Sequence, residues 1–297
     1  MKIVVTGREG QVVRSLVERA SLHPEITLLT LGRPDFDLAQ PDTVFDAIAT
    51  AKPDLVVSAA AYTAVDQAED EPELAHAINA TGAGTVAAAA ARAGAPVVHL
   101  STDYVFAGEG DTPYAEDDPT GPHGVYGQTK LAGEALVAQA NGKHLILRTA
   151  WVYSPFGKNF IKTMLHLAAN RDSLSVVSDQ WGNPTSAIDI ADGILHAANR
   201  LRTDPQFDAF GVYHLAGTGS TNWSTFARAI FQASRDEQGP FAEVKDILTS
   251  EYPTKARRPL NSRLNTEKFH AVFGWQAPSW EQSTISTVKR LLQPSAL

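Results

Sequence analysis

The sequence predicts an α/β fold, with a doubly wound parallel sheet of the Rossmann type followed by a smaller C-terminal substrate-binding part. Short β-branched runs such as KIVVT and DLVVSA alternate with longer runs of helical character such as GQVVRSLVERA. The strand runs are apolar throughout, which is typical of a parallel sheet that helices cover on both faces. After about residue 150 the alternation becomes irregular, and polar and aromatic residues gather in loops.

These observations divide the chain into a dinucleotide-binding unit at 1–150 and a mainly substrate-binding part at 151–297. We expect the chain to return to the first unit around 174–205, because the helical run IDIADGILHAANRLR can pack on the sheet. The segment 106–124, FAGEGDTPYAEDDPTGPHG, is a long loop rich in Gly, Pro and Asp. Loops of this length in compact domains are usually functional.

Composition excludes several classes of protein. The chain has 297 residues, a net charge of −8 and no run of five or more basic residues, which argues against a nucleic-acid-binding surface. Without cysteine there is no disulfide framework, thiolate metal site or thiol nucleophile. The nine histidines show no HExxH-like spacing, so we expect no required protein-bound metal. The first apolar run, IVV, is too short for a signal peptide or a membrane span, so we expect a cytoplasmic protein with small-molecule partners and no membrane attachment.

The turn after the first strand has the residues of a phosphate-binding loop. Gly7 and Gly10 precede a helix start, where free backbone amides and the positive helix end favour a pyrophosphate. Gly10 would let the phosphate approach the backbone, whereas Val13 stands where a third glycine is common. An ordinary strand-to-helix turn would use the same residues, and the sequence leaves that alternative open.

The end of the second strand bears on the choice of nicotinamide cofactor. Gly32 and Arg33 stand where an acidic residue commonly holds the ribose of NAD, and Arg33 can pair with a 2′-phosphate. Arg8, in the glycine loop, adds a second cation. We therefore expect NADPH, while Asp35 and Asp37 keep NADH open.

The third and fourth strands deliver further candidates to the same edge of the sheet. Ala59, Ala60 and Ala61 end the third strand and would let a flat cofactor pass close to the backbone, although helix packing also favours small residues. Residues 101–104, STDY, end the fourth strand. Their hydroxyls either line the crevice or cap the following segment.

Tyr126 and Lys130 lie four residues apart in HGVYGQTKLAGEALVAQA, a run of helical character. Residues at this spacing face the same side of a helix whether or not they do chemistry. Spacing alone therefore does not separate a catalytic pair from two solvated side chains. The pair becomes catalytic only if the rest of the chain builds a crevice beside it.

Eight motifs, in this order and spacing, resemble the extended short-chain dehydrogenase/reductases. They are TGREGQV, AAYTAVDQAE, NATG, LSTDYVFAG, YGQTKLAGE, LRTAWVYSPFGKNF, DQWGNPTSAIDIAD and ARRPLNSRLN. The resemblance runs along nearly the whole chain. It implies reduction of the 4-keto group of dTDP-4-dehydro-L-rhamnose, a dTDP-4-keto-6-deoxy-sugar, with NADPH or NADH. It also implies a place in cell-surface polysaccharide synthesis and is compatible with a homodimer.

Carried over residue by residue, the resemblance assigns Thr102, Tyr126 and Lys130 as the catalytic residues. Tyr126 would donate a proton to the alkoxide that develops as the ketone is reduced. Lys130, one turn away, would lower the pKa of the phenol by its positive charge and hold the nicotinamide ribose. Thr102 would hydrogen-bond the same carbonyl oxygen. Asn79 matches an asparagine that supports a proton relay in related reductases, or else it is an internally bonded helix residue.

The pattern and the resemblance together imply two groups of binding residues. Those expected at the cofactor are Gly7, Arg8, Gly10, Gln11, Val12, Arg33, Asp37, Leu38, Ala61, Tyr62, Thr63, Tyr126 and Lys130. Those expected at the sugar nucleotide are Thr63, Val65, Thr102, Asp103, Tyr104, Trp151 and Arg258. Trp151 would stack beside the sugar, or else pack at a junction within the fold. Arg258, or its neighbour Arg257, would neutralise the diphosphate.

Two alternative functions stay open. Another nucleotide-sugar ketoreductase or epimerase would keep every core motif and differ only in the loops around Trp151 and Arg258. A non-catalytic subunit similar to the regulatory β subunit of methionine adenosyltransferase would share the fold and much of the pattern. The intact Thr102, Tyr126 and Lys130 favour an enzyme.

Overall fold

Six parallel strands form the centre of the molecule. The computed structural model describes residues 1–293. Within the sheet the strand order is β10-β5-β4-β3-β1-β2, and each neighbouring pair is parallel. The strands are β1 (Lys2–Thr6), β2 (Thr27–Leu31), β3 (Leu55–Ser58), β4 (Val97–Thr102), β5 (His144–Thr149) and β10 (Gly211–His214). Apolar β-branched residues fill β1 and β3, which are buried on both faces, as the unbroken apolar runs predict.

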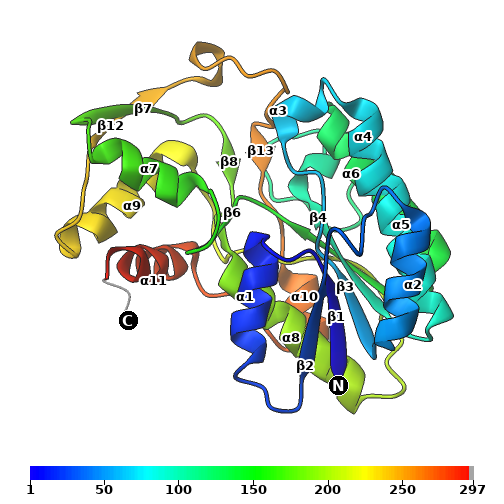
Figure 1. Ribbon diagram of the computed structural model, residues 1–297. Coiled ribbons are helices and arrows are strands. Elements are labelled where there is room, and N and C mark those ends of the chain that lie inside the picture. Colours follow the sequence, from blue (N-terminus) through cyan, green and yellow to red (C-terminus); the bar gives the residue numbers. More distant parts are fainter. Residues whose placement is uncertain (294–297) are drawn as a thin grey trace.

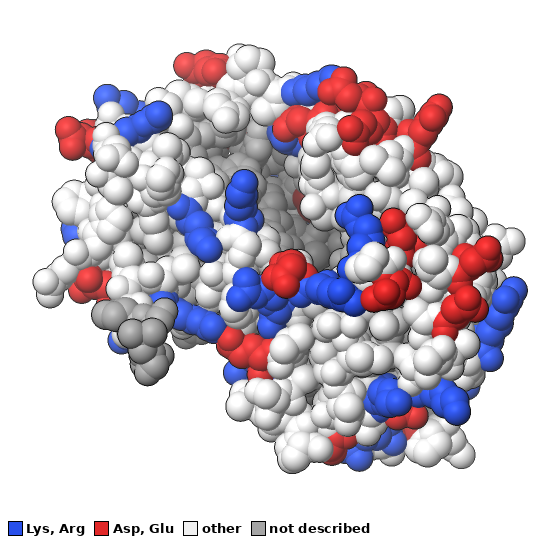
Figure 2. All heavy atoms as spheres, in the orientation of Figure 1, with Lys and Arg blue, Asp and Glu red and all other residues white. Residues whose placement is uncertain are grey.

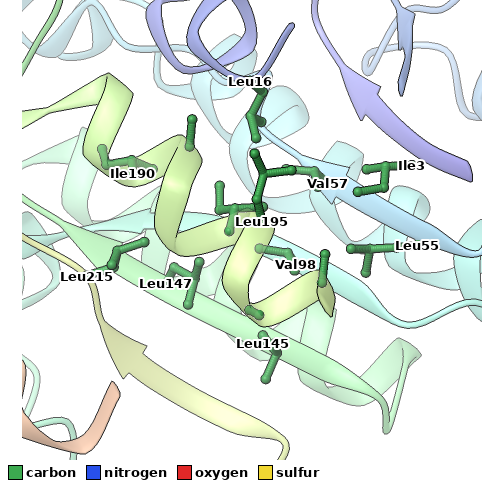
Figure 3. Packing of buried hydrophobic residues seen from close by; sticks show 14 of the residues in the cluster. Ile3, Leu16, Leu55, Val57, Val98, Leu145, Leu147, Ile190, Leu195 and Leu215 are labelled. Carbon is green, nitrogen blue, oxygen red and sulfur yellow. The ribbon is translucent and has the colours of Figure 1, made fainter. Parts of the chain in front are cut away.

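Helices cover both faces of this sheet (Figure 1), which confirms the predicted fold class. One face carries α1 (Gln11–Ala20), α8 (Ala187–Thr203) and α10 (Glu267–Phe273). The other face carries α2 (Pro41–Ala51), α5 (Ala83–Arg92) and α6 (Val125–Ala140). Figure 3 shows the first face, where Ile190 and Leu195 of α8 lie over Leu145 and Leu147 of β5. Each such buried side chain contributes about 1.5–3 kcal/mol to folding.

A second lobe lies beside the carboxyl ends of the strands. It consists of α7 (Phe160–Ala168), α9 (Trp223–Asp236), α11 (Trp280–Leu292) and a parallel pair of strands, β7 (Ser173–Val177) and β12 (Glu243–Ile247). Its own apolar core includes Ile161, Phe226 and Ile230. Short strands connect the lobes: β6 (Val152–Tyr153) pairs with β9 (Thr185–Ser186), and β8 (Trp181–Gly182) lies between β11 (Thr221–Asn222) and β13 (Asn261–Ser262).

The chain passes between the lobes more than once. Residues 174–205 divide between them, since β7 pairs with β12 in the second lobe whereas α8 packs against α1. β10 then joins the edge of the central sheet beside β5. The sheet is therefore complete only when residues well beyond 150 are included.

Four short elements follow β3 and β4 at the edge where the strands end, namely α3 (Val65–Ala68), α4 (Pro72–His76), η1 (Ala77–Gly82) and η2 (Asp103–Val105). A fifth, η3 (Thr249–Glu251), follows β12 in the second lobe. η1 is a π-helical turn, a rare form that often occurs at functional sites. Strand order reverses between β1 and β3, and ligands of open α/β sheets bind at such a switch point. Within residues 1–293, none of the helices combines the length and apolarity needed to cross a bilayer.

Candidate active site

A cavity of about 830 Å³ lies between the two lobes, above the carboxyl ends of the strands. Figure 2 shows the surface hollowed there, with Lys and Arg side chains on its margins. Three of the predicted sugar-nucleotide residues line the cavity, namely Tyr104, Trp151 and Arg258. A smaller cavity of about 480 Å³ lies among Met1, Pro96 and Phe207, at the opposite, amino ends of the strands.

The glycine loop takes the shape that the sequence predicts. Gly7 has φ of +100°, a conformation that L side chains rarely adopt, and a Cβ there would lie 3.3 Å from Val13 Cγ2. Its N–H donates to the backbone oxygen of Leu31 (2.6 Å), so Gly7 supplies the turn rather than a phosphate donor. Gly10 caps α1 without a side chain, which leaves the amides of the first turn accessible at the positive end of the helix.

Gln11 joins the cofactor edge of the sheet to the second lobe. Its Oε1 accepts hydrogen bonds from Ser154 Oγ (2.8 Å) and Asn159 Nδ2 (3.0 Å). The side-chain oxygen of Gln11 is therefore occupied by hydrogen bonds from the segment after β6, and the backbone amide is the group that can bind a phosphate. Val12 is partly buried and packs against the core of the first face.

The two predicted cofactor arginines meet at the end of β2. Arg8 Nη1 donates to the backbone oxygen of Arg33 (3.0 Å), and Arg8 Nη2 lies 3.5 Å from the Asp35 carboxylate. A Cβ on Gly32 would lie 2.9 Å from Arg8 Cγ, so glycine makes room for the arginine stem. Arg33 itself is exposed. The structure thus brings both cations to the same corner of the crevice.

The loops after β2 and β3 meet η1. Leu38 is buried, and a Cβ on Gly82 would lie 2.8 Å from it; Asp37 is partly exposed beside it and accepts a hydrogen bond from the Ala39 amide (3.0 Å). Asn79 accepts from the Tyr62 amide (2.8 Å) and donates to the Tyr62 oxygen (3.0 Å).

The Asn79 amide therefore supports the chain at residues 61–63. Its Nδ2 also lies 3.2 Å from Thr129 Oγ1 on α6, and its side chain is 1% exposed. These contacts agree with the second alternative, in which Asn79 is an internally hydrogen-bonded helix residue. Ala61 and Thr63, held on either side of Tyr62, lie at the carboxyl end of β3, where the sequence places the cofactor.

The predicted catalytic residues converge between β4 and α6. Thr102 is the last residue of β4, and Tyr126 lies in the first turn of α6. Thr102 Oγ1 donates to Asp103 Oδ1 (2.9 Å) and accepts from the Tyr104 amide (3.2 Å). The rings of Tyr104 and Tyr126 meet edge to face, with centroids 5.5 Å apart.

One electrostatic expectation is wrong. Lys130 was expected to lower the pKa of the Tyr126 phenol, but that pKa is raised above its ordinary value. Burial is the largest cause, followed by the negative charge of Asp103, and hydrogen bonding with Thr102 only partly opposes them. The Lys130 ammonium instead donates to the backbone oxygen of Leu100 (2.6 Å). Tyr126 therefore holds its proton firmly at neutral pH.

Asp103 is buried beside Tyr126. Burial raises its pKa to about 6, although hydrogen bonds from Ser262, Thr102 and the backbone oppose the rise. Its Oδ2 is buried and lacks a hydrogen-bond partner within residues 1–293. A buried acceptor without a partner is costly, and a hydroxyl group of a ligand would satisfy it.

Trp151 lines the cavity and also packs at the junction of the lobes. Its ring stacks on Trp223, with centroids 3.6 Å apart and planes at 9°. A Cβ on Gly182 would lie 2.4 Å from Trp151 Cε2, so glycine lets β8 approach the ring. The position of Trp151 is therefore compatible both with stacking beside the sugar and with packing at the junction of the lobes.

The two arginines of the ARRP motif have different surroundings. Arg258 is partly buried and forms an ion pair with Asp66 on α3, while its Nη1 is buried without a hydrogen-bond partner in the part of the chain described. Arg257 is exposed, 3.8 Å from Glu109. Arg258 is thus the arginine of the cavity wall. Val65 begins α3, directly before Asp66, and is partly buried.

Sequence reasoning missed several residues of this site. Trp223 stacks on Trp151, Asp66 pairs with Arg258, and His99 contacts Lys130. His99 begins the run HLSTDYVF, but a single histidine within a strand has no metal-ligand spacing that would distinguish it. Asp66 and Trp223 carry no local signal, because their partners are far away in the sequence. Among residues 1–293, no group of three or more His, Asp or Glu is placed to hold a metal ion.

Comparison with known proteins extends this geometry. The family model described as RmlD substrate binding domain matches residues 1–293. The dTDP-4-dehydrorhamnose reductase of Sinorhizobium fredii is 50% identical and that of Escherichia coli 44% identical, each over 98% of this chain and covering 98% and 97% of the relative.

Solved structures agree with the relatives. A dTDP-4-dehydrorhamnose reductase from Clostridium acetobutylicum superposes with a TM-score of 0.91 at 35% identity, over 99% of this chain and 100% of that one. The enzyme of the same name from Bacillus anthracis, in complex with NADP, has a TM-score of 0.88 at 35% identity, over 96% and 98%. The glycine loop, the Tyr126–Lys130 helix and the cavity wall thus belong to a shared architecture, and the chain is a member of the dTDP-4-dehydrorhamnose reductase family.

Proposed function

We propose that this protein is an NADPH-dependent oxidoreductase that reduces the 4-keto group of dTDP-4-dehydro-L-rhamnose to give dTDP-L-rhamnose. The observation that carries the proposal is the position of Tyr126, a protonated phenol that is hydrogen-bonded with Thr102 and packs against Tyr104, a residue of the cavity wall. The names of the relatives and of the NADP-bound neighbour support it.

The residues at the β1/β3 switch point fit a dinucleotide. A Cβ on Gly7 would lie 3.6 Å from Ala60 Cβ, so only small groups form the floor between the two strands. The first turn of α1 presents backbone amides to the pyrophosphate. Arg8 and Arg33 would bind the 2′-phosphate, residues 37–38 would lie near the adenine, and residues 61–63 would lie along the cofactor. When bound, NADPH would supply the hydride that reduces the ketone carbon.

The protein's own residues manage the proton. As negative charge develops on the ketone oxygen, Tyr126 donates its phenolic proton to that oxygen. Thr102 turns its hydroxyl from Asp103 to the same oxygen and orients it. Lys130, one helical turn away on α6, would hold the hydroxyls of the nicotinamide ribose. Because the pKa of Tyr126 is raised, the phenol is protonated at neutral pH and can act as the acid.

The cavity walls hold the nucleotide sugar. Asp103 Oδ2 accepts a hydrogen bond from a sugar hydroxyl, and Trp151 packs against the sugar ring. Arg258 pairs with the diphosphate through the Nη1 that lacks a protein partner. Tyr104, Val65 and Thr63 complete the wall near the sugar.

The decisive experiment is NADPH oxidation in the presence of dTDP-4-dehydro-L-rhamnose generated in situ. We expect turnover that depends on both compounds and a product identified as dTDP-L-rhamnose. Turnover only with another 4-keto deoxysugar would favour a different ketoreductase, and sugar epimerisation without net NADPH loss would favour an epimerase. No turnover with retained nucleotide binding would favour a regulatory subunit.

Six finer points are part of the proposal. We place the enzyme in the cytoplasm, with a role in cell-surface polysaccharide synthesis, because a nucleotide sugar is a donor for glycosyl transfer. A homodimer is the proposed assembly, and residues 1–150 and 151–297 are the proposed main divisions. Catalysis needs no protein-bound metal in this scheme, and NADH is the weaker of two usable cofactors.

A further inference from the structure

The Lys130 ammonium is held by β4. The residue is 2% exposed, and its Nζ donates to the Leu100 oxygen (2.6 Å) and lies 3.3 Å from His99 Nε2. An ammonium has three hydrogens to donate and no lone pair to accept. Successive residues of one strand thus engage two of the three hydrogens, which leaves one for the reaction.

The tautomer of His99 follows from its neighbours. Because Lys130 can only donate, His99 Nε2 must be the unprotonated nitrogen, and the ring proton lies on Nδ1. Nδ1 is 3.1 Å from Ser58 Oγ at the end of β3, and His99 is 1% exposed. Burial, reinforced by the charge of Lys130, lowers the pKa of His99 well below its ordinary value, so the ring is neutral.

Other charges near the pair are already engaged. Glu134, one turn further along α6, would raise the pKa of Lys130, but its carboxylate accepts from Arg148 Nε (3.0 Å), Arg148 Nη2 (2.7 Å) and Ser101 Oγ (2.5 Å). Burial dominates and lowers the pKa of Lys130 to about 8. On α6, Tyr126 is the other titratable neighbour, one turn before Lys130. Within residues 1–293, His99 is the titratable side chain in hydrogen-bond contact with Nζ.

We propose that His99 is a positioning residue, whose Nε2 fixes the Lys130 ammonium beside Tyr126 and whose Nδ1 ties that position to the strand bordering the cofactor crevice. The role rests on the proposed function, because it acts on the reaction only through Lys130. It differs from plain packing, since an apolar side chain of similar volume would fill the space without accepting the ammonium proton. A glutamine would retain an acceptor near the position of Nε2.

Enzyme kinetics distinguish a positioning role of His99 from a role in packing alone. His99→Leu should lower kcat by roughly 10- to 150-fold, the loss expected for one hydrogen bond to a charged group, with little change in KM for the nucleotide sugar. The alkaline limb of the kcat profile should move to lower pH, because the ammonium loses an acceptor. His99→Gln should restore most of kcat and the position of the limb.

His214→Leu is the matched control, since His214 is also fully buried but contacts the Asn265 oxygen instead. It should lower thermal stability without moving the pH limb. The proposal is overturned if His99→Leu keeps kcat within threefold of wild type with an unmoved limb, or if His99→Gln is no better than His99→Leu.

Imidazole ¹⁵N NMR of the wild-type protein tests the contact without relying on activity or on a variant that folds. His99 should show the neutral Nδ1–H tautomer from pH 6 to 7, where Lys130 is charged, and Lys130→Met should shift its Nε2 resonance. A charged ring or an Nε2–H tautomer would overturn the proposal even in an active enzyme. Conversely, absence of NADPH oxidation by a wild-type protein with the expected spectrum would contradict the proposed function and leave the Lys130–His99 contact supported.

Discussion

Arg258 and Asp66, 192 residues apart in the chain, form an ion pair in the wall of the inter-lobe cavity. Asp66 Oδ1 also accepts a hydrogen bond from the Ala256 amide (3.0 Å), so one carboxylate fixes both the side chain and the backbone of the arginine segment. Since Arg258 Nη1 stays without a partner in the described chain, the pair orients a guanidinium rather than neutralising all of it.

Arg258→Met should raise KM for the dTDP-sugar by about 10- to 150-fold, because a charge-assisted hydrogen bond to the diphosphate is lost. The affinity for NADPH should not change. Lys255→Met is the control, since Lys255 pairs with Asp70 between the same two segments but is exposed. Equal effects of the two substitutions on KM would refute a specific role for Arg258.

Tyr126→Phe keeps the ring and removes only the acidic proton. We expect kcat to fall by roughly 10²–10⁴, with NADPH affinity close to wild type. Steady-state turnover and a cofactor titration followed by fluorescence measure the two quantities. Turnover close to that of wild type would show that another group supplies the proton.

Arg33→Ala should raise KM for NADPH by roughly 10-fold or more and leave KM for NADH almost unchanged, because only NADPH carries the 2′-phosphate. The penalty should shrink at high salt, since Arg33 is exposed. Arg8→Ala should have the same selectivity, and Arg257→Ala should affect neither cofactor. If Arg33→Ala weakens both cofactors equally, Asp35 or Asp37 is the better candidate for the ribose.

Trp151→Ala should affect stability as well as substrate binding. The stack on Trp223 and the contact with Gly182 make the ring part of the junction, and loss of a packed Trp costs about 3–5 kcal/mol, less where the ring is partly exposed. Trp151→Phe should keep most of the stability and still raise KM for the sugar. Chemical denaturation and KM measured on the same samples distinguish the two effects. A stable Trp151→Ala variant with normal KM would contradict both roles.

Gly108→Ala should raise KM for the sugar without touching a ligand. Gly108 has φ of +76°, and a Cβ there would lie 2.3 Å from Pro259 Cβ, so the segment next to Arg258 must move. Gly110→Ala is the matched control, because Gly110 has φ of +79° but nothing within 4 Å of its Cβ position. An effect of the same size in both variants would indicate backbone strain alone.

Local patterns were sufficient to predict the parts of the site that lie within one strand, turn or helix. Gly7 and Gly10 follow a strand directly, and Tyr126 and Lys130 share a helix face. In both cases the spacing in the sequence is enough to predict how the residues lie relative to each other. The functional role of the long loop 106–124 stays a prediction; its Gly108 and Tyr114 contact the residues that follow Arg258.

Long-range contacts set the limit of that reasoning. Which aromatic ring meets Trp151, and which acid meets Arg258, depends on how distant loops are brought together by packing. The sequence also does not show that Tyr126 is buried next to Asp103, which raises the pKa of the phenol, or that the Lys130 ammonium is held by β4. The division of the chain at residue 150 stays a prediction.

The return of the chain to the sheet also dictates the order in which the protein can be completed during synthesis. The face of the sheet that contains Leu147 is covered by α8 and by Phe269 of α10, both of which are made much later than β5. At roughly 5–20 residues per second, α8 follows β5 out of the ribosome by about 3–10 s. For that interval α1 is the only one of the three helices of this face that has been made, and the apolar side chains that α8 and α10 later cover stay exposed, so this stage is the one at which a chaperone would be most needed.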